Sequence, residues 1–229
     1  MIYLKNKGID IPGLVTSYYE IGPIGNFAPG QIVIIPSLYP NKDRLVLKVD
    51  VSSDPSEKIL KGDVTPLSQP HIPVRSMGLA SDEYAFVIKG KPRPAVVLGG
   101  GFSRWPTNPS EQLYVCAPLY STDKQKITQR YVIEAQALLY PSMFYIPSSA
   151  LFHIEESIAR FALIQVAHGT AMKPAIAGNK PVMLSGEFFK WMRTQLVRFI
   201  GGSLPHNVVD DLKAYGELVL NEAKLQGMK

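Results

Sequence analysis

A single cysteine, Cys116, occurs among the 229 residues, so no disulfide can form within the chain. Its apolar neighbours Val115 and Ala117 indicate a strand position, where a cysteine packs as a small hydrophobic side chain. Long apolar runs are also missing: none approaches the roughly 20 residues that cross a bilayer, and the N-terminus holds no stretch typical of a signal peptide. We therefore expect an unprocessed, cytoplasmic protein with no membrane partner.

The motifs of common metal and cofactor chemistry are absent as well. The four histidines are scattered, and His153-Ile-Glu155 lacks the Pro-Cys-x-x-Cys that completes a zinc deaminase site. The run Gly99-Gly-Gly101 is not followed by the Lys-Ser/Thr of a phosphate-binding loop, so it indicates a turn or a β-bulge. No Gly-x-Ser-x-Gly elbow occurs. We expect neither a metal nor a cofactor.

The composition indicates a folded, basic protein. With 46% hydrophobic residues and no long polar tract, the chain can bury a full core. Its net charge of +5 and pI of about 9.2 permit a polyanionic partner, since a positive field attracts phosphates at long range. Many basic proteins bind no nucleic acid, so the charge alone leaves the partner open.

Short β-rich runs separated by Pro and Gly occupy the chain up to about residue 149. This spacing predicts a small barrel or sandwich rather than alternating βαβ units. The runs are 31–35, 44–51, 84–89, 95–98, 113–117, 129–139 and 143–146. Residues 52–78 contain repeated prolines and predict a long loop, whereas 157–168 carries apolar periodicity with a strand-like end.

Two amphipathic helices are predicted in the C-terminal part, 171–229. Ser185 is the expected N-cap of the first, with Glu187 in its first turn and Gly201-Gly202 at its end. The second is expected from about 207 to 226, because its apolar positions lie three or four residues apart. These positions are Phe188, Met192, Leu196 and Ile200 in the first helix and Leu212, Tyr215, Val219 and Ala223 in the second.

The most informative feature is a pair of apolar strands, Arg93-Pro-Ala-Val-Val-Leu98 and Ala117-Pro-Leu-Tyr-Ser121, each of which ends in a turn. The pair resembles the core of the PemK/MazF family of toxin ribonucleases, in which an Arg-Pro-Val-Val-Val-Leu strand precedes one ending in Ala-Pro-(Ile/Leu)-Thr-Ser. The resemblance implies an α+β, β-rich fold in a single domain, 1–229. Residues 1–170 would form an SH3-like β-barrel core, followed by the C-terminal helices. Gly30-Gln-Ile-Val matches the family's first strand, but the segment at about 36–92 then makes a long insertion.

The resemblance assigns catalytic roles to three side chains. In the family an arginine ahead of the first strand stabilises the scissile phosphate, and Arg93, held extended between two prolines, matches it. Tyr120 stands where the family has threonine and Ser121 is the next hydroxyl, so both are expected to assist proton transfer or orientation. The tyrosine departs from the family and favours stacking on a base. Two alternatives stay open: Arg93 pairs with a carboxylate such as Glu83, or Tyr120 borders the barrel with its ring half-buried.

Further cations surround these motifs and predict a face that tracks phosphates. They are Lys89 and Lys91 beside Arg93, and Lys124, Lys126 and Arg130 after the strand of Tyr120. Solvated loop and turn residues are the alternative explanation of such scattered charges. The segment from Glu155 to Arg160 is a loose counterpart of an Asp-Gln-Ile-Arg segment in the family, and this would place Arg160 near the site.

The resemblance predicts a protein that binds single-stranded RNA and, if active, cuts it as a metal-independent endoribonuclease by attack of the ribose 2′-hydroxyl on the adjacent phosphate. It also implies a homodimer that an antitoxin protein neutralises. Phe188, Trp191 and Met192 form a candidate contact stripe, unless they belong to the core. Two other classes remain: a non-catalytic module of the same fold that binds nucleic acid or protein, and a structural or assembly protein.

Overall fold

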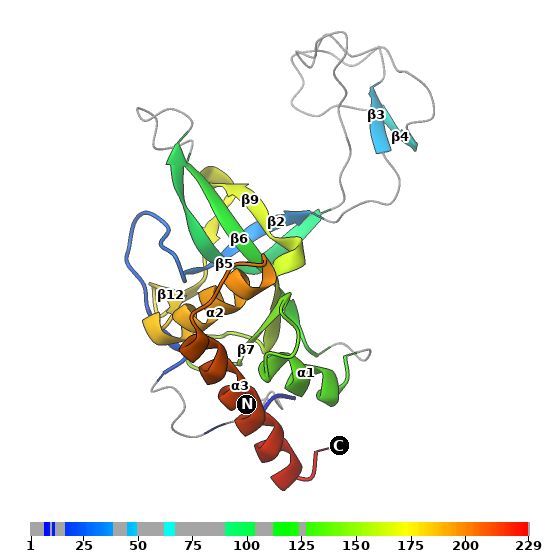
Figure 1. Ribbon diagram of the computed structural model, residues 1–229. Coiled ribbons are helices and arrows are strands. Elements are labelled where there is room, and N and C mark those ends of the chain that lie inside the picture. Colours follow the sequence, from blue (N-terminus) through cyan, green and yellow to red (C-terminus); the bar gives the residue numbers. More distant parts are fainter. Residues whose placement is uncertain are drawn as a thin grey trace. The chain divides into compact units, whose positions relative to one another are not determined.

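The computed structural model (Figure 1) describes residues 7–9, 11, 17–38, 45–49, 62–66, 90–103, 112–123 and 127–228. The chain divides into two compact units. One is Ser37–Lys91, and the other combines Met1–Pro36 with Pro92–Lys229. The insertion expected at about 36–92 covers the same stretch of chain as the first unit. The strand predicted at 84–89 lies outside the described residues.

The described part of the Ser37–Lys91 unit contains one antiparallel ladder. Strand β3 (Leu45–Val49) pairs with β4 (Gly62–Pro66), with Leu45 opposite Pro66 and Val49 opposite Gly62. The strand predicted at 44–51 is confirmed. The long loop predicted at 52–78 is wrong for β4, which pairs with β3, because a strand at the edge of a ladder tolerates a proline such as Pro66.

The larger unit is built on an antiparallel sheet in the order β10-β2-β5-β6-β8-β7, with β9 paired to β6. Its strands are β2 (Ile32–Leu38), β5 (Gly90–Ser103), β6 (Gln112–Ser121), β7 (Met143–Ile146), β8 (Ser157–Arg160), β9 (Gln165–His168) and β10 (Lys173–Pro174). β6 has β5 along one edge and, along the other, β8 and then β9, separated by the 3₁₀ turn η3 (Phe161–Leu163). This arrangement makes β6 the central strand.

The glycine run produces a bulge in the long β5–β6 ladder. The register shifts between Val97 and Gly99 and again between Gly100 and Phe102. A Cβ at Gly100 would overlap the ring of Tyr114, and Gly101 has a φ of 81°, which disfavours a larger residue. The bulge predicted from the three glycines is confirmed.

A smaller sheet has the order β1-β12-β11, and its strands precede α2 in the chain. It consists of β1 (Tyr19–Ile21), β11 (Ile176–Ala177) and β12 (Lys180–Leu184). β11 and β12 are joined by Gly178 and Asn179, which have φ values of 56° and 65°. Two consecutive positive φ values are typical of a type I′ turn, and glycine and asparagine are the residues that tolerate them.

Three α-helices complete the fold: α1 (Gln129–Gln136), α2 (Gly186–Phe199) and α3 (His206–Leu225). Figure 1 shows α2 and α3 in orange to red, with α1 packed beside α3. The Ser185 hydroxyl accepts a hydrogen bond of 3.3 Å from the backbone N–H of Phe188, as expected of an N-cap. Both predicted C-terminal helices are confirmed. No helix within the described residues is long and apolar enough to cross a membrane.

The strand predicted at 129–139 is wrong, because this segment begins with α1. Tyrosine, valine and isoleucine favour strands locally, which is why the sequence pattern misleads. The Thr128 hydroxyl caps the helix by accepting from the backbone N–H of Tyr131, and Ile133 and Ala137 pack against Val219 of α3. Packing on α3 therefore overrides the local β propensity.

The main core lies where α2 packs on the sheets. Val96 of β5, Leu119 of β6 and Ile146 of β7 belong to the same buried cluster as Phe188 and Met192 of α2. Since Phe188 and Met192 are buried, and the partly buried Trp191 packs its ring on Tyr215, the stripe considered as an antitoxin contact belongs to the core. The α+β class is confirmed. The described strands pair into open sheets, and among them no barrel closes.

Candidate functional site

Arg93 and Tyr120 lie side by side on neighbouring strands. In the β5–β6 ladder Ala95 is opposite Pro118, so the same register two residues further along sets Arg93 beside Tyr120. The Cζ atom of Arg93 lies 4.4 Å from the centroid of the Tyr120 ring, within the range of a cation–π interaction. Arg93 is 7% exposed, whereas Tyr120 is partly buried. The two sequence motifs that define the family resemblance thus meet in one contact.

Arg160 reaches the same ring from the other side of β6 in the sheet order. β8 places Ile158 opposite Tyr120 and ends at Arg160, whose Cζ atom lies 5.6 Å from the Tyr120 ring centroid. Unlike Arg93, Arg160 is exposed. Two guanidinium groups from different strands therefore contact one phenol ring. The sequence indicated Arg160 only through a loose counterpart of a family segment.

A pocket of about 410 Å³ opens at this ring. It is lined by Tyr120, Ser121, Ile127, Thr128, Tyr131, Ile158 and Arg160. Two of its hydroxyls have roles in the fold, since Thr128 caps α1 and the Tyr131 hydroxyl lies 2.9 Å from the sulfur of Met143. The pocket combines one cation, several hydroxyls, two aromatic rings and aliphatic walls. A group that is partly anionic and partly flat and apolar fits this chemistry.

Lys7 supports the pocket at Ile127, one of its lining residues. The ammonium of Lys7 donates to the carbonyl of Thr122 at 2.6 Å and to that of Ile127 at 2.9 Å, so it links these two residues. Sequence reasoning missed this residue, because its partners lie more than a hundred positions away and no motif links them. Only the folded chain brings them together.

A buried carboxylate, Glu156, anchors the same region just before β8. It accepts hydrogen bonds from the backbone N–H groups of Lys7 and Gly8, at 3.0 and 2.7 Å, and from the Tyr145 hydroxyl at 2.8 Å. The Thr122 hydroxyl is a fourth donor. Burial, together with the negative charge of Glu156, raises the pKa of Tyr145 well above its ordinary value, so the phenol stays a donor. Sequence reasoning saw Glu156 only as part of a family-like segment.

Of the five cations predicted to track phosphates, two lie within the described residues. Lys91 is exposed on β5, and Arg130 is exposed on α1, where it donates to Glu134 at 2.8 Å. Lys89, Lys124 and Lys126 lie outside the described residues, as does Glu83, the carboxylate considered as a partner of Arg93. Ser121 lines the pocket, but Arg130 does not.

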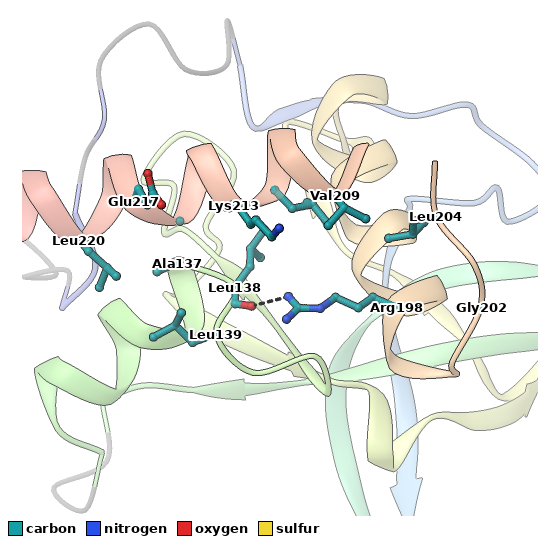
Figure 2. Close-up of a pocket in the computed structure, with 12 residues that line it drawn as sticks. Ala137, Leu138, Leu139, Arg198, Gly202, Leu204, Val209, Lys213, Glu217 and Leu220 are labelled. Carbon is teal, nitrogen blue, oxygen red and sulfur yellow. Dashed lines mark hydrogen bonds between the residues drawn. The ribbon is translucent and has the colours of Figure 1, made fainter. Parts of the chain in front are cut away.

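A second pocket, of about 390 Å³, lies between the end of α1 and the pair α2 and α3 (Figure 2). Its walls are mainly aliphatic and include Leu138, Leu204, Val209 and Leu220. Figure 2 shows Arg198 directed at the carbonyl of Leu138, to which it donates at 2.9 Å. This contact supports Leu138, whose φ of 58° is uncommon for a leucine. None of the predicted site residues lines this pocket.

The described residues offer neither a cluster suited to a metal ion nor an exposed thiol. Within them, no group of three or more His, Cys, Asp or Glu side chains is placed to hold a metal ion. Cys116 is buried in β6, as its apolar neighbours predicted, and burial raises the pKa of its thiol to about 12. Because the thiolate is the reactive form, Cys116 is not a nucleophile at neutral pH.

Comparisons with protein-family models, with curated proteins and with solved structures found no match. The described features of the candidate site are an antiparallel α+β fold and a pocket lined by Tyr120, whose ring lies near the guanidinium groups of Arg93 and Arg160.

Proposed function

We propose that this chain is a PemK/MazF-like protein with an SH3-like core that binds single-stranded RNA at the Tyr120 pocket and cleaves it without a metal, as a toxin endoribonuclease. The observation that supports this most is the contact between the two family-like motifs. Arg93 and Tyr120, which are separated in sequence, lie 4.4 Å apart beside a pocket that also holds Arg160. Chance resemblance of two short strands does not require their site positions to meet.

The pocket has the chemistry of a nucleotide site. Its volume of about 410 Å³ falls within the roughly 300–1,000 Å³ of typical small-molecule sites. Arginine binds phosphate through charge-assisted hydrogen bonds, and a tyrosine ring stacks on a base for about 1–3 kcal/mol. Stacking is tolerant of sequence and needs an unpaired base, which favours a single strand over a duplex.

Cleavage in this proposal follows the transphosphorylation implied by the resemblance. The ribose 2′-oxygen attacks the adjacent phosphorus, its proton passes to a base, and the bond from phosphorus to the 5′-oxygen breaks. The leaving oxygen takes up a proton, so the products are a 2′,3′-cyclic phosphate and a 5′-hydroxyl. Tyr120 and Ser121 are pocket hydroxyls that would assist proton transfer or orientation in this step, and the positive charge around the ring would stabilise the charge that develops on the phosphate.

A binding module without cleavage is the second candidate, and two observations favour it. Tyr120 replaces the family's threonine, and Arg93 is 7% exposed behind the phenol ring. A buried guanidinium has less access to a scissile phosphate than an exposed one. Stacking and ion pairing would survive these departures, whereas transition-state stabilisation would be weaker.

The test compares the wild type with Arg93→Ala, Tyr120→Phe and the control Arg193→Ala, an exposed arginine on α2. Each purified protein is incubated with a labelled single-stranded RNA pool in EDTA, and both fragmentation and retention of the RNA are measured. Metal-independent cleavage that is lost in Arg93→Ala and kept in Arg193→Ala supports the ribonuclease. Retention without fragmentation supports the binding module. Neither activity in the wild type refutes the RNA proposal and leaves a structural or assembly role.

The toxin part of the proposal has its own test in cells. Expression without a partner is expected to arrest growth, and the arrest should be relieved by Arg93→Ala but not by Arg193→Ala. A homodimer and a neutralising antitoxin protein are the partners that go with this proposal. Unimpeded accumulation of the wild-type protein would argue against toxicity, although it would not affect RNA binding measured in vitro.

A further inference from the structure

We propose that Arg160 is the side chain that contacts the RNA phosphate in the Tyr120 pocket, and that Arg93 is a positioning residue that holds the Tyr120 ring. This inference rests on the proposed function and reverses the role that the family resemblance assigns to Arg93. It follows from the burial, the contacts and the strand positions of the two arginines.

The two arginines differ in their access to the pocket. A phosphate oxygen must come within about 2.7–2.9 Å of an N–H group to form a charge-assisted hydrogen bond. Arg93 is 7% exposed and is not among the residues that line the pocket. Arg160 is exposed and does line it. A ligand that enters the pocket therefore meets Arg160 and the Tyr120 ring.

The arginines also differ in whether a hydrogen bond or ion pair within the fold already engages their charge. Arg130 is paired with Glu134, and Arg198 donates to the Leu138 carbonyl. The guanidinium of Arg160 makes no hydrogen bond or ion pair with any residue that the structure describes, and its one recorded contact is with the Tyr120 ring. Arg160 lines the pocket and is not paired with any carboxylate of the described residues, which is the arrangement expected of a side chain that binds an anion.

Arg93 is the closer of the two arginines to the Tyr120 ring. The Cζ of Arg93 lies 4.4 Å from the ring centroid, closer than the 5.6 Å of Arg160. Cation–π attraction is stronger when the cation is desolvated, as Arg93 is by burial. Arg93 therefore fixes the ring from within the protein, and the ring in turn forms a wall of the pocket at which Arg160 is placed.

Arg160 lies at the end of β8, a strand that is well anchored in the fold. β8 begins one residue after Glu156, whose carboxylate is held by Lys7, Gly8, Thr122 and Tyr145. β8 is also paired on both sides, with β6 and with β7. A cation at the end of such a strand has a defined position, which is what recognition of a phosphate requires.

The experiment measures binding of a 2′-O-methyl oligoribonucleotide, which cannot be cleaved, by fluorescence anisotropy from 50 to 200 mM salt. The variants are Arg160→Gln, Arg160→Lys, Arg93→Gln and the matched control Arg193→Gln. Loss of one phosphate contact should reduce the slope of log K against log salt by about 0.7, and the affinity on the order of tenfold. We expect this for Arg160→Gln only, with the slope restored in Arg160→Lys. Arg93→Gln should keep the wild-type slope and lower kcat on the cleavable RNA.

Two results separate this inference from the proposed function. If the wild type binds RNA but Arg160→Gln keeps its slope while Arg93→Gln loses it, the inference is overturned and the family role of Arg93 stands. A second probe, inorganic phosphate, is followed through the side-chain Nε–Hε NMR signals. A shift of Arg160 without any RNA binding would overturn the RNA proposal but keep the anion contact. Binding of neither probe by the wild type overturns both.

Discussion

Replacing Glu156 with glutamine should destabilise the protein by about 2–4 kcal/mol. The carboxylate accepts from Lys7 N–H and the Thr122 hydroxyl on one oxygen, and from Gly8 N–H and the Tyr145 hydroxyl on the other. A glutamine amide has one oxygen and one NH₂ group. Whichever way it turns, a backbone N–H is left facing a donor, because only the hydroxyls can rotate to accept.

The magnitude follows from two effects. A buried donor left without an acceptor costs about 1–3 kcal/mol, and the surviving bonds lose the assistance of the negative charge. The assay is equilibrium urea unfolding followed by circular dichroism. Glu155→Gln is the matched control, because this neighbouring carboxylate is exposed, and it should change the free energy of unfolding by less than about 0.5 kcal/mol. Equal stability of the two variants would refute the role assigned to Glu156.

Three further predictions concern packing and reactivity. Gly216→Ala should lower the thermal midpoint, although alanine has the better helix propensity. The reason is that a Cβ at this position of α3 would lie 2.7 Å from the carbonyl oxygen of Ala137. An unchanged or raised midpoint in a calorimetric scan would contradict this prediction. Gln136→Leu should lower the free energy of unfolding in urea by about 1–3 kcal/mol, because it removes both hydrogen bonds between that amide and the backbone of Ile9, at 2.8 and 2.6 Å. Gln136→Glu should restore only the hydrogen bond that the side chain accepts from the Ile9 N–H. Cys116 should react with a thiol reagent at pH 8 only after unfolding. Burial raises its pKa to about 12, so the thiol of the folded protein is protonated at pH 8. Fast labelling of the folded protein would contradict its burial.

Local patterns predicted the elements whose signals lie within a few residues of each other. The N-cap at Ser185, the periodicity of α3 and the bulge at Gly99–Gly101 all follow from neighbouring side chains and backbone conformation. The helix at 129–136 was missed, because its β-favouring composition is overridden by packing against α3. β4 was missed because the prolines around it indicate a loop, whereas pairing with β3 makes it a strand.

The residues of the candidate site also differ in whether a local sequence pattern marks them. Arg93, Tyr120 and Ser121 were predicted because each belongs to a strand motif that can be read directly from the sequence. Their meeting depends on the register of β5 and β6, which the residues alone do not specify. The supporting residues Lys7 and Glu156 carry no local signal, since every contact that gives them a role spans distant parts of the chain, apart from the bond to Tyr145.

The sequence by itself therefore determined the α+β composition, the C-terminal helices, the buried cysteine and the residue types of the site, because periodicity, capping and strand motifs act over short distances. Tertiary structure alone decided which arginine is buried and which is exposed. That choice depends on how β5, β6 and β8 pair around Tyr120, since pairing register sets the neighbours and the solvent access of each charged side chain.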